Sequence, residues 1–309
     1  MNRGALQIVA GAACFGLIPL FLTACSSDSA ILIACGRAAF ASLFAAIFLV
    51  IRKNSFRLTL KQFCHYFIWS MQLTLAIVFY FLSIQCAGHA IPGMVIGLQP
   101  LFVAMFAFIL FRERISPRTW MSCALALVGI VLLSGFLPGK EVEGTGLLYA
   151  LFSAFLLGIN FTYHLKFLHG ESAYRLVFFQ NLFQLPILAV VLFFVPFHFV
   201  LSDLFPFALL GVICTGAAYI LIYAGSKSVK KEHIGILQLI ENVIPVFTGI
   251  FFAHEQLTWS AVAGISLILF AGFWNVAKKM NSPALLLRIT MAHKLKLDFA
   301  KDKEPVSAD

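Results

Sequence analysis

Charged side chains are scarce in this sequence of 309 residues. Asp, Glu, Lys and Arg make up only 11% of it, whereas hydrophobic residues make up 61%. A soluble globular domain carries about 25% charged residues, so this chain has too few charges to cover a water-facing surface. The mean hydropathy of +0.96 and the 34 phenylalanines instead indicate an all-α integral membrane protein that crosses the bilayer several times.

Several functional patterns are also absent from the sequence. No G-x-x-x-x-G-K-[ST] phosphate-binding loop occurs, so nothing indicates an ATP-driven pump. The seven cysteines include no C-x-x-C pair, and we therefore expect small hydrophobic side chains instead of metal ligands or disulfides. No His/Asp/Glu cluster or Ser/His/Asp set is visible near the membrane surface, so we predict no catalytic residue.

Apolar runs of about 20 residues, the length that a bilayer core requires, alternate with short polar breaks. We predict ten transmembrane helices from these runs. They lie at about residues 4–23, 30–51, 64–86, 90–111, 119–136, 146–163, 174–195, 203–224, 234–253 and 259–277.

Basic residues gather on one side of this topology. With ten spans both termini lie on the same side, and that side holds 20 of the 22 Lys and Arg; Lys140 alone lies opposite, and Arg37 lies inside a span. Because basic loops stay cytoplasmic, we predict both termini inside the cell, in the inner (plasma) membrane. The formal charge of +9 then reflects topology and contact with anionic lipid at the cytoplasmic face, and implies no nucleic-acid partner.

The chain repeats itself at an offset of 142 residues. The sequence "ERIS" (113–116) falls on "EQLT" (255–258), and Gln99 falls on Glu241. Several matches at one offset indicate a duplication. Each half holds five predicted spans, an odd number, so the second half is inverted relative to the first. Inverted repeats place substrate sites near the midplane, between the halves. The predicted units are a first repeat, a second repeat and a basic cytoplasmic tail, at residues 1–140, 141–279 and 280–309.

Together these features resemble the EamA type of the drug/metabolite transporter superfamily. The similarity consists of five plus five helices, "GLIP" and "GINF" in the first helix of each half, E-x-[IL]-[ST] after each fourth helix, and "QPLFVAMFAFILFRE". The second half departs from that pattern, because Asn242 stands where the first half has Pro100. The resemblance covers about residues 4–277. It implies a secondary carrier without a cofactor, whose central cavity is lined by helices one, three, four, six, eight and nine.

Glu241 is the only acidic residue deep inside a predicted span, four residues before Pro245. An acid at a helix centre is costly to insert, and such residues usually serve a function. Pro245 cannot donate a hydrogen bond to the carbonyl of Glu241, so the kink offers a carboxylate and a freed backbone acceptor, both suited to an ammonium group. The alternative is a carboxylate that only fixes helix packing, with the embedded Arg37 as its obvious partner.

Arg37 has two interpretations. It lies about 10 Å along its helix from the outer end, and either snorkels to the outer interface or contacts a substrate carboxylate. Other polar side chains fall in spans expected to line the cavity, and the alternative for each is a hydrogen bond between helices. The predicted substrate-binding residues are Arg37, Tyr80, Gln99, Asn160, Tyr219, Tyr223, Gln238 and Glu241. A further polar patch in helix seven either lines the cavity or joins helices; it comprises Gln180, Asn181 and Gln184.

The sequence therefore predicts a secondary active transporter that moves a small amine-bearing metabolite by alternating access. An amino acid or a compound like S-adenosylmethionine fits this description. One alternative is a broader exporter of cationic drugs or metabolites, and another, from a different class, is an integral membrane enzyme that modifies lipids. The sequence leaves open the direction of transport, the coupling ion and the oligomeric state, including a homodimer.

Overall fold

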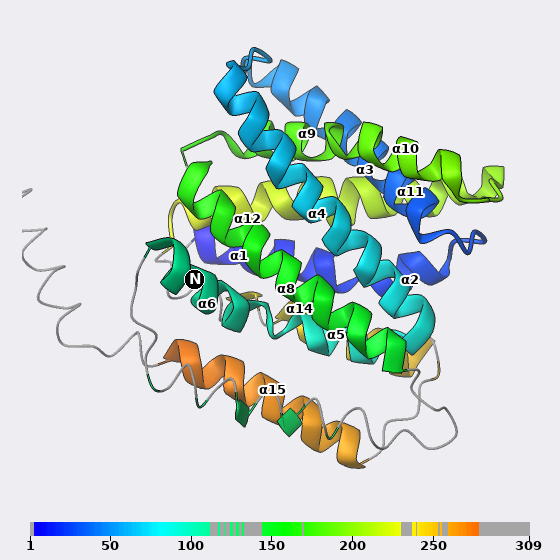
Figure 1. The fold of residues 1–309 in the computed structure, drawn as a ribbon, viewed down its shortest axis with the longest axis vertical. Helices are drawn as coiled ribbons and strands as arrows, with labels where there is room; N and C mark the ends of the chain where they lie inside the picture. The colour runs from blue at the N-terminus through cyan, green and yellow to red at the C-terminus, as the bar shows by residue number, and fades with distance from the viewer. Residues whose placement is uncertain are drawn as a thin grey trace, which may run out of the picture.

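The protein is described by a computed structural model in which every element of the described chain is a helix. The described residues are 3–111, 144–168, 170–229, 237–238, 240–252, 254 and 259–277, with isolated positions between 117 and 132. Figure 1 shows long helices lying alongside one another, with α15 (Trp259–Ala277) at the edge of the bundle.

The remaining helices follow in chain order. The first half contains α1 (Arg3–Gly16), α2 (Ile18–Thr23), α3 (Ala30–Ile51), α4 (Leu60–Ala87), α5 (Ala90–Ile96) and α6 (Gln99–Phe111). The second half begins with α8 (Gly144–Phe167), α9 (Ala173–Leu182), α10 (Gln184–Phe194) and the 3-10 helix η1 (Leu201–Asp203). It continues with α11 (Leu204–Gly211), the π-helix η2 (Val212–Ala217), α12 (Ala218–Ser226) and α14 (Ile240–Phe252).

Seven segments are long and apolar enough to cross a membrane, so the protein is a multi-pass membrane protein. They are Arg3–Thr23, Ala30–Ile51, Leu60–Ala87, Ile91–Leu110, Gly144–Phe167, Ala173–Phe194 and Leu201–Ser226. These coincide, within a few residues, with seven of the ten predicted spans. The predicted ninth and tenth spans contain the shorter apolar helices Ile240–Phe252 and Val262–Ala271. The predicted span 119–136, apart from isolated positions, and the tail 280–309 lie outside the described residues, so the count of ten remains a prediction.

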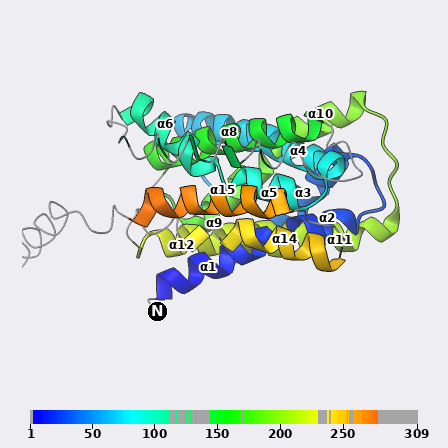
Figure 2. The ribbon, with the colours of Figure 1, turned by 90° about the horizontal axis from the view of Figure 1, so that it is seen from below.

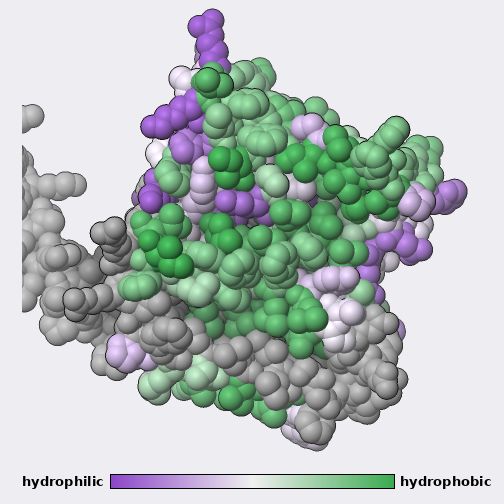
Figure 3. Space-filling model, viewed as in Figure 1, coloured by the Kyte–Doolittle hydropathy of each residue, from purple (hydrophilic) through white to green (hydrophobic). Residues whose placement is uncertain are grey.

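The side of the bundle is apolar, as contact with lipid requires. Large hydrophobic side chains project from it, among them Phe193 at 86% exposure and Leu43 at 61%. In Figure 3 a broad hydrophobic face lies between hydrophilic patches at its ends. Exposed apolar surface of this extent is rare on soluble monomers and suits the hydrocarbon of a bilayer.

The two ends of the bundle differ in charge. One end, called here the basic end, holds Arg3, the α3–α4 loop with Arg57, Arg175 in the first turn of α9, and Lys227 after α12. The opposite end, called the far end, holds the α2–α3 loop (24–29) and the segment before η1. Figure 2 shows the N-terminus at one end of the bundle and these two loops at the other.

Several spans are interrupted part-way along their length. Helix α1 gives way to α2 at Leu17, and α5 gives way to α6 at Gly97 and Leu98. Pro19 and Pro100 each take the second position of the helix that follows the break, where the missing N–H leaves no intrahelical bond unmade. The eighth span contains the π-helix η2 instead of a break. Interrupted helices and π-helical turns both occur preferentially at functional sites in membrane carriers and other proteins.

Helix α14 is held tightly between the first helix and α5. A Cβ atom at Gly93 of α5 would lie 2.5 Å from Cβ of Pro245, and one at Gly16 of α1 would lie 2.6 Å from Cβ of Ile244. Only glycine permits these approaches, since real side chains do not pack that closely. A Cβ atom at Gly16 would also lie 3.2 Å from the carbonyl oxygen of Glu241. The carbonyl oxygen of Glu241, which Pro245 leaves without an intrahelical donor, thus lies against α1, and its contact with a ligand stays a prediction.

Candidate substrate cavity

A narrow cavity of about 60 Å³ lies inside the bundle, with walls from both halves of the chain. All eight residues predicted from the sequence to bind substrate line it: Arg37, Tyr80, Gln99, Asn160, Tyr219, Tyr223, Gln238 and Glu241. They come from spans two, three, four, six, eight and nine, and Phe15 adds span one. The structure thus brings the predicted residues together, whereas their role in binding remains a proposal.

Glu241 reaches this cavity from the first turn of α14. Within the described part of the chain its carboxylate takes part in no hydrogen bond and no ion pair. The packing interpretation requires Arg37 as its partner, but the guanidinium of Arg37 is bonded elsewhere. The described residues therefore leave the carboxylate uncompensated in the wall of the cavity.

Arg37 is buried in the bundle, with 1% of its surface exposed. Its Nη1 donates to Oγ1 of Thr215 over 3.0 Å, and its Nη2 donates to Oε1 of Gln184 over 2.6 Å. The snorkelling interpretation is therefore wrong, because the guanidinium is fixed inside the bundle by α10 and η2. Both partners are neutral, and Nε has no hydrogen-bond partner among the described residues. This arrangement holds a positive charge beside the cavity without a counter-charge.

Neighbouring groups set the direction of these two bonds. The hydroxyl of Thr215 donates to the carbonyl of Leu210 over 2.8 Å, so its oxygen accepts from Arg37. The amide nitrogen of Gln184 donates to the carbonyl of Gln180 over 3.0 Å, which turns its oxygen toward the guanidinium. Gln184 thus joins helices, as one of the two interpretations of the helix-seven patch predicted. Within α9, the amide nitrogen of Asn181 donates to the carbonyl of Val177.

Aromatic rings form a continuous row along the cavity. Tyr219 and Tyr223 stack with centroids 5.4 Å apart, and Tyr223 lies 4.8 Å from the ring of His164. His164 in turn stacks on Trp69 at 5.5 Å, and Phe15 meets Tyr219 edge-on at 4.6 Å. A row of π-faces of this kind attracts a cation or a planar ring.

The other predicted residues divide by what their polar atoms do. Asn160 donates from Nδ2 to the carbonyl of Trp69 over 2.7 Å, so its amide nitrogen joins α8 to α4. The side chains of Tyr80, Gln99 and Gln238 take no hydrogen bond within the described residues. These three side chains therefore have polar atoms available to a ligand.

Among the residues of the cavity wall that were not predicted from the sequence, His164 and Thr215 carry polar side chains. His164 lies four residues after Asn160 on one face of α8, a spacing that offered a signal for its place. Thr215 offered none, because nothing in the sequence marks the π-helix that turns it toward Arg37. No group of His, Cys, Asp and Glu in the described chain is arranged to hold a metal ion.

Comparison with known proteins agrees with this architecture. A model of the EamA-like transporter family matches the chain twice, over residues 2–135 and 144–277, which confirms the resemblance noted in the sequence. The "Uncharacterized transporter" of Archaeoglobus fulgidus is 27% identical over 195 residues, 63% of this chain and 70% of that protein. The "Uncharacterized transporter YetK" of Bacillus subtilis is 25% identical over 254 residues, 75% of this chain and 71% of that protein.

The fold itself also matches a solved protein. A crystal structure aligns with a TM-score of 0.68 over 91% of this chain and 100% of the other. The two sequences are 18% identical in that alignment, so the match shows a shared fold alone.

Proposed function

Because the chain belongs to the EamA-like transporter family, we propose that it is a secondary transporter of a small amine-bearing metabolite. The family and the names of its relatives support membrane transport of a small molecule. The amine, the alternating-access mechanism and the site residues are inferences from the cavity.

The observation that carries the proposal is the uncompensated carboxylate of Glu241. A carboxylate removed from water is destabilised unless a positive charge or several hydrogen bonds replace its hydration. No group in the described chain supplies them. An ammonium group would do so through a charge-assisted hydrogen bond, which is stronger than a neutral one. The row from Trp69 to Tyr219 adds aromatic faces that favour the same cation.

Arg37 extends the proposal to the other end of the substrate. Its charge lines the cavity, and among the described residues its side-chain bonds go to the neutral Gln184 and Thr215. A substrate carboxylate would neutralise it, and guanidinium binds carboxylates with two parallel hydrogen bonds. A substrate with both groups, such as an amino acid or a compound like S-adenosylmethionine, matches both poles of the cavity.

The size of the cavity supports alternating access. A cavity of about 150 Å³ is needed to hold a molecule the size of benzene, and this one measures about 60 Å³. Loading a metabolite therefore requires the walls to move apart. Because the walls come from both halves of an inverted repeat, movement of one half against the other would open the cavity toward one side of the membrane at a time.

The basic end is proposed to face the cytoplasm. Arg57, Arg175 and Lys227 lie at this end, and basic loops are retained on the cytoplasmic side of an inner membrane. The same charges would contact anionic lipid headgroups there.

Uptake into proteoliposomes tests the amine directly. Radiolabelled amino acids and S-adenosylmethionine are offered to the purified protein, each beside an analogue whose amine is acetylated. The proposal expects uptake of at least one amine and none of its acetylated analogue. Equal uptake of both would contradict it. A broad exporter, which the aromatic row also favours, would instead be inhibited by many unrelated organic cations.

A further inference from the structure

Polar contacts tie the two halves of the chain together at each end of the bundle. The basic-end latch is defined here as the contacts of Glu171, in the α8–α9 loop. The far-end latch is defined as the contact of Asp203, in η1, with the α2–α3 loop. Both latches lie at the ends of spans, and both are closed in this structure.

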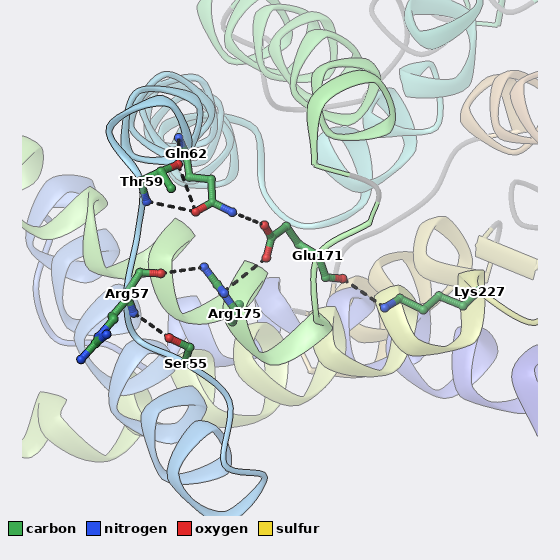
Figure 4. A network of polar contacts seen from close by, with 7 residues as sticks. All are labelled: Ser55, Arg57, Thr59, Gln62, Glu171, Arg175 and Lys227. Carbon is green, nitrogen blue, oxygen red and sulfur yellow. Dashed lines mark hydrogen bonds and ion pairs between the residues drawn. The ribbon is translucent and has the colours of Figure 1, made fainter.

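Glu171 is the centre of the basic-end latch, as Figure 4 shows. Its Oε1 accepts a hydrogen bond from Nε2 of Gln62 over 2.8 Å, and its Oε2 forms an ion pair with Nε of Arg175 at 3.3 Å. Its backbone oxygen accepts from Nζ of Lys227 over 3.0 Å. Glu171 thus joins the start of α4, in the first half, to the start of α9 and the end of α12, in the second half.

The partners of Glu171 are themselves held in place. The backbone N–H of Thr59 donates to Oε1 of Gln62 over 3.1 Å in a capping box, which leaves the amide nitrogen of Gln62 to donate to Glu171. Nη2 of Arg175 donates to the carbonyl of Arg57 over 3.1 Å. Two bonds therefore cross between the halves here, one from the start of α4 to the α8–α9 loop and one from the start of α9 to the α3–α4 loop.

An aromatic layer connects this latch to the cavity. Gln62, Tyr66 and Trp69 follow one another on one face of α4, at helical spacing. Tyr66 and Trp69 are fully buried, and Trp69 packs 6.1 Å from Tyr223, which lines the cavity. The basic-end latch thus fixes the start of α4, and with it the rings of Tyr66 and Trp69 between the latch and the cavity.

The far-end latch uses the equivalent segments of the inverted halves. Oδ1 of Asp203 accepts from the backbone N–H of Ser26 over 2.8 Å. At the offset of 142 residues, Asp203 falls beside the start of α4, and Ser26 falls in the α8–α9 loop. Asp203 is fully buried, and its Oδ2 has no partner within the described chain. The start of the third span fastens the basic end, and the start of the eighth fastens the far end.

We propose that these two latches are the alternating gates of the carrier, one opening while the other stays closed. The inference rests on the proposed transport but not on the identity of the substrate. Each latch joins one half of the chain to the other, so each must break for the cavity to open at its end. At the basic end, the two bonds that cross between the halves run from Gln62 to Glu171 and from Arg175 to the carbonyl of Arg57. Single hydrogen bonds contribute little net stability, which allows this latch to break and re-form.

Cys214 lines the cavity and is fully buried, so its labelling reports on opening. In a variant that keeps Cys214 as its sole cysteine, a membrane-impermeant maleimide is added from one side of sealed vesicles. Glu171→Ala should raise labelling from the basic-end side about two- to fivefold, as expected for loss of a partly exposed ion pair. Asp203→Ala should raise labelling from the far side instead.

Matched controls remove a charge at the same ends without touching a latch. Lys61 and Asp28 make no side-chain bond in the described chain, so Lys61→Ala and Asp28→Asn should leave labelling unchanged. Should Glu171→Ala not fold, Arg175→Ala replaces it, because it removes the bond from Nη2 of Arg175 to the carbonyl of Arg57. Labelling that does not respond to the latch variants, or that rises on both sides together, would overturn the inference. Such a result would leave the substrate proposal intact, because labelling needs no substrate.

Discussion

Glu241 and Arg37 line the same cavity but form no ion pair with each other. The side-chain bonds of Arg37 go to the neutral Gln184 and Thr215, and Glu241 has no bond to a described residue. Two buried opposite charges normally pair, since each alone is destabilised. Their separation leaves each available to a charged group of a ligand, which is the basis of the proposed substrate class.

Arg37→Gln removes the positive pole and keeps a hydrogen-bonding side chain. We expect affinity for a carboxylate-bearing substrate to fall by about tenfold or more, because a hydrogen bond to a charged group contributes about 1.5–3 kcal/mol. The decarboxylated amine should bind equally well to both proteins. Isothermal titration with the two ligands measures this, and an equal loss for both would show that Arg37 acts on the fold and not on the carboxylate.

The aromatic row should discriminate between ring and aliphatic replacements. Tyr223→Phe keeps the π-face, whereas Tyr223→Leu removes it and should weaken a cationic ligand by about 0.5–2 kcal/mol. Tyr149 packs on Phe79 away from the cavity, so Tyr149→Leu serves as the control. The affinity of each of the three variants for a cationic ligand is measured. Equal affinities of Tyr223→Phe and Tyr223→Leu would show that the aromatic row does not contact the ligand.

The close approach of α5 to α14 should limit substitution at Gly93. A Cβ there would lie 2.5 Å from that of Pro245, so Gly93→Ala should lower the free energy of unfolding by about 1–3 kcal/mol. Gly144 has no atom within 4 Å of the equivalent position, and Gly144→Ala should be close to neutral. Thermal unfolding in detergent compares the two, and equal melting temperatures would contradict this packing.

Cys25 in the far-end loop should be unusually slow to react. Burial and the neighbouring Asp203 carboxylate raise the pKa of its thiol from 9.0 to about 12. At pH 8 the thiolate fraction is therefore about a thousandfold lower than that of an ordinary cysteine, and thiolate is the reactive form. Asp203→Asn removes the negative charge that raises this pKa, while its Oδ1 can still accept from the backbone N–H of Ser26, so alkylation at pH 8 should accelerate. Alkylation of unmodified protein at the rate of a free thiol would contradict the closed far end.

The sequence was sufficient to predict eight of the polar residues that line the cavity, though not His164 and Thr215. A polar side chain in an apolar span is costly unless it faces a partner or a cavity, so Glu241, Gln99 and Asn160 marked the inward faces of their helices. The span boundaries followed for a similar reason, since apolar length is set by the thickness of the bilayer. Both inferences depend on properties local to one helix.

What could not be predicted depends on residues distant in the chain. Arg37 bonds to residues 147 and 178 positions away, and no local pattern specifies that pairing. No amino-acid composition specifies the π-helix η2, which contains Thr215. The basic-end latch joins the α8–α9 loop to the start of α4 and to the end of α12. The sequences of these segments look like those of ordinary solvated connections. Only their arrangement in space shows that they fasten the two halves together.

Glu241→Gln tests the central claim most directly. The substitution keeps the size of the side chain and its hydrogen bonding but removes the charge. A carboxyl that binds proton and ammonium in alternation makes uptake depend on pH, so uptake of the amine by the unmodified protein should vary with pH and uptake by the variant should not. Affinity should also fall by at least about 1.5 kcal/mol, roughly tenfold. Transport with unchanged affinity and an unchanged pH profile would show that the carboxylate of Glu241 only packs.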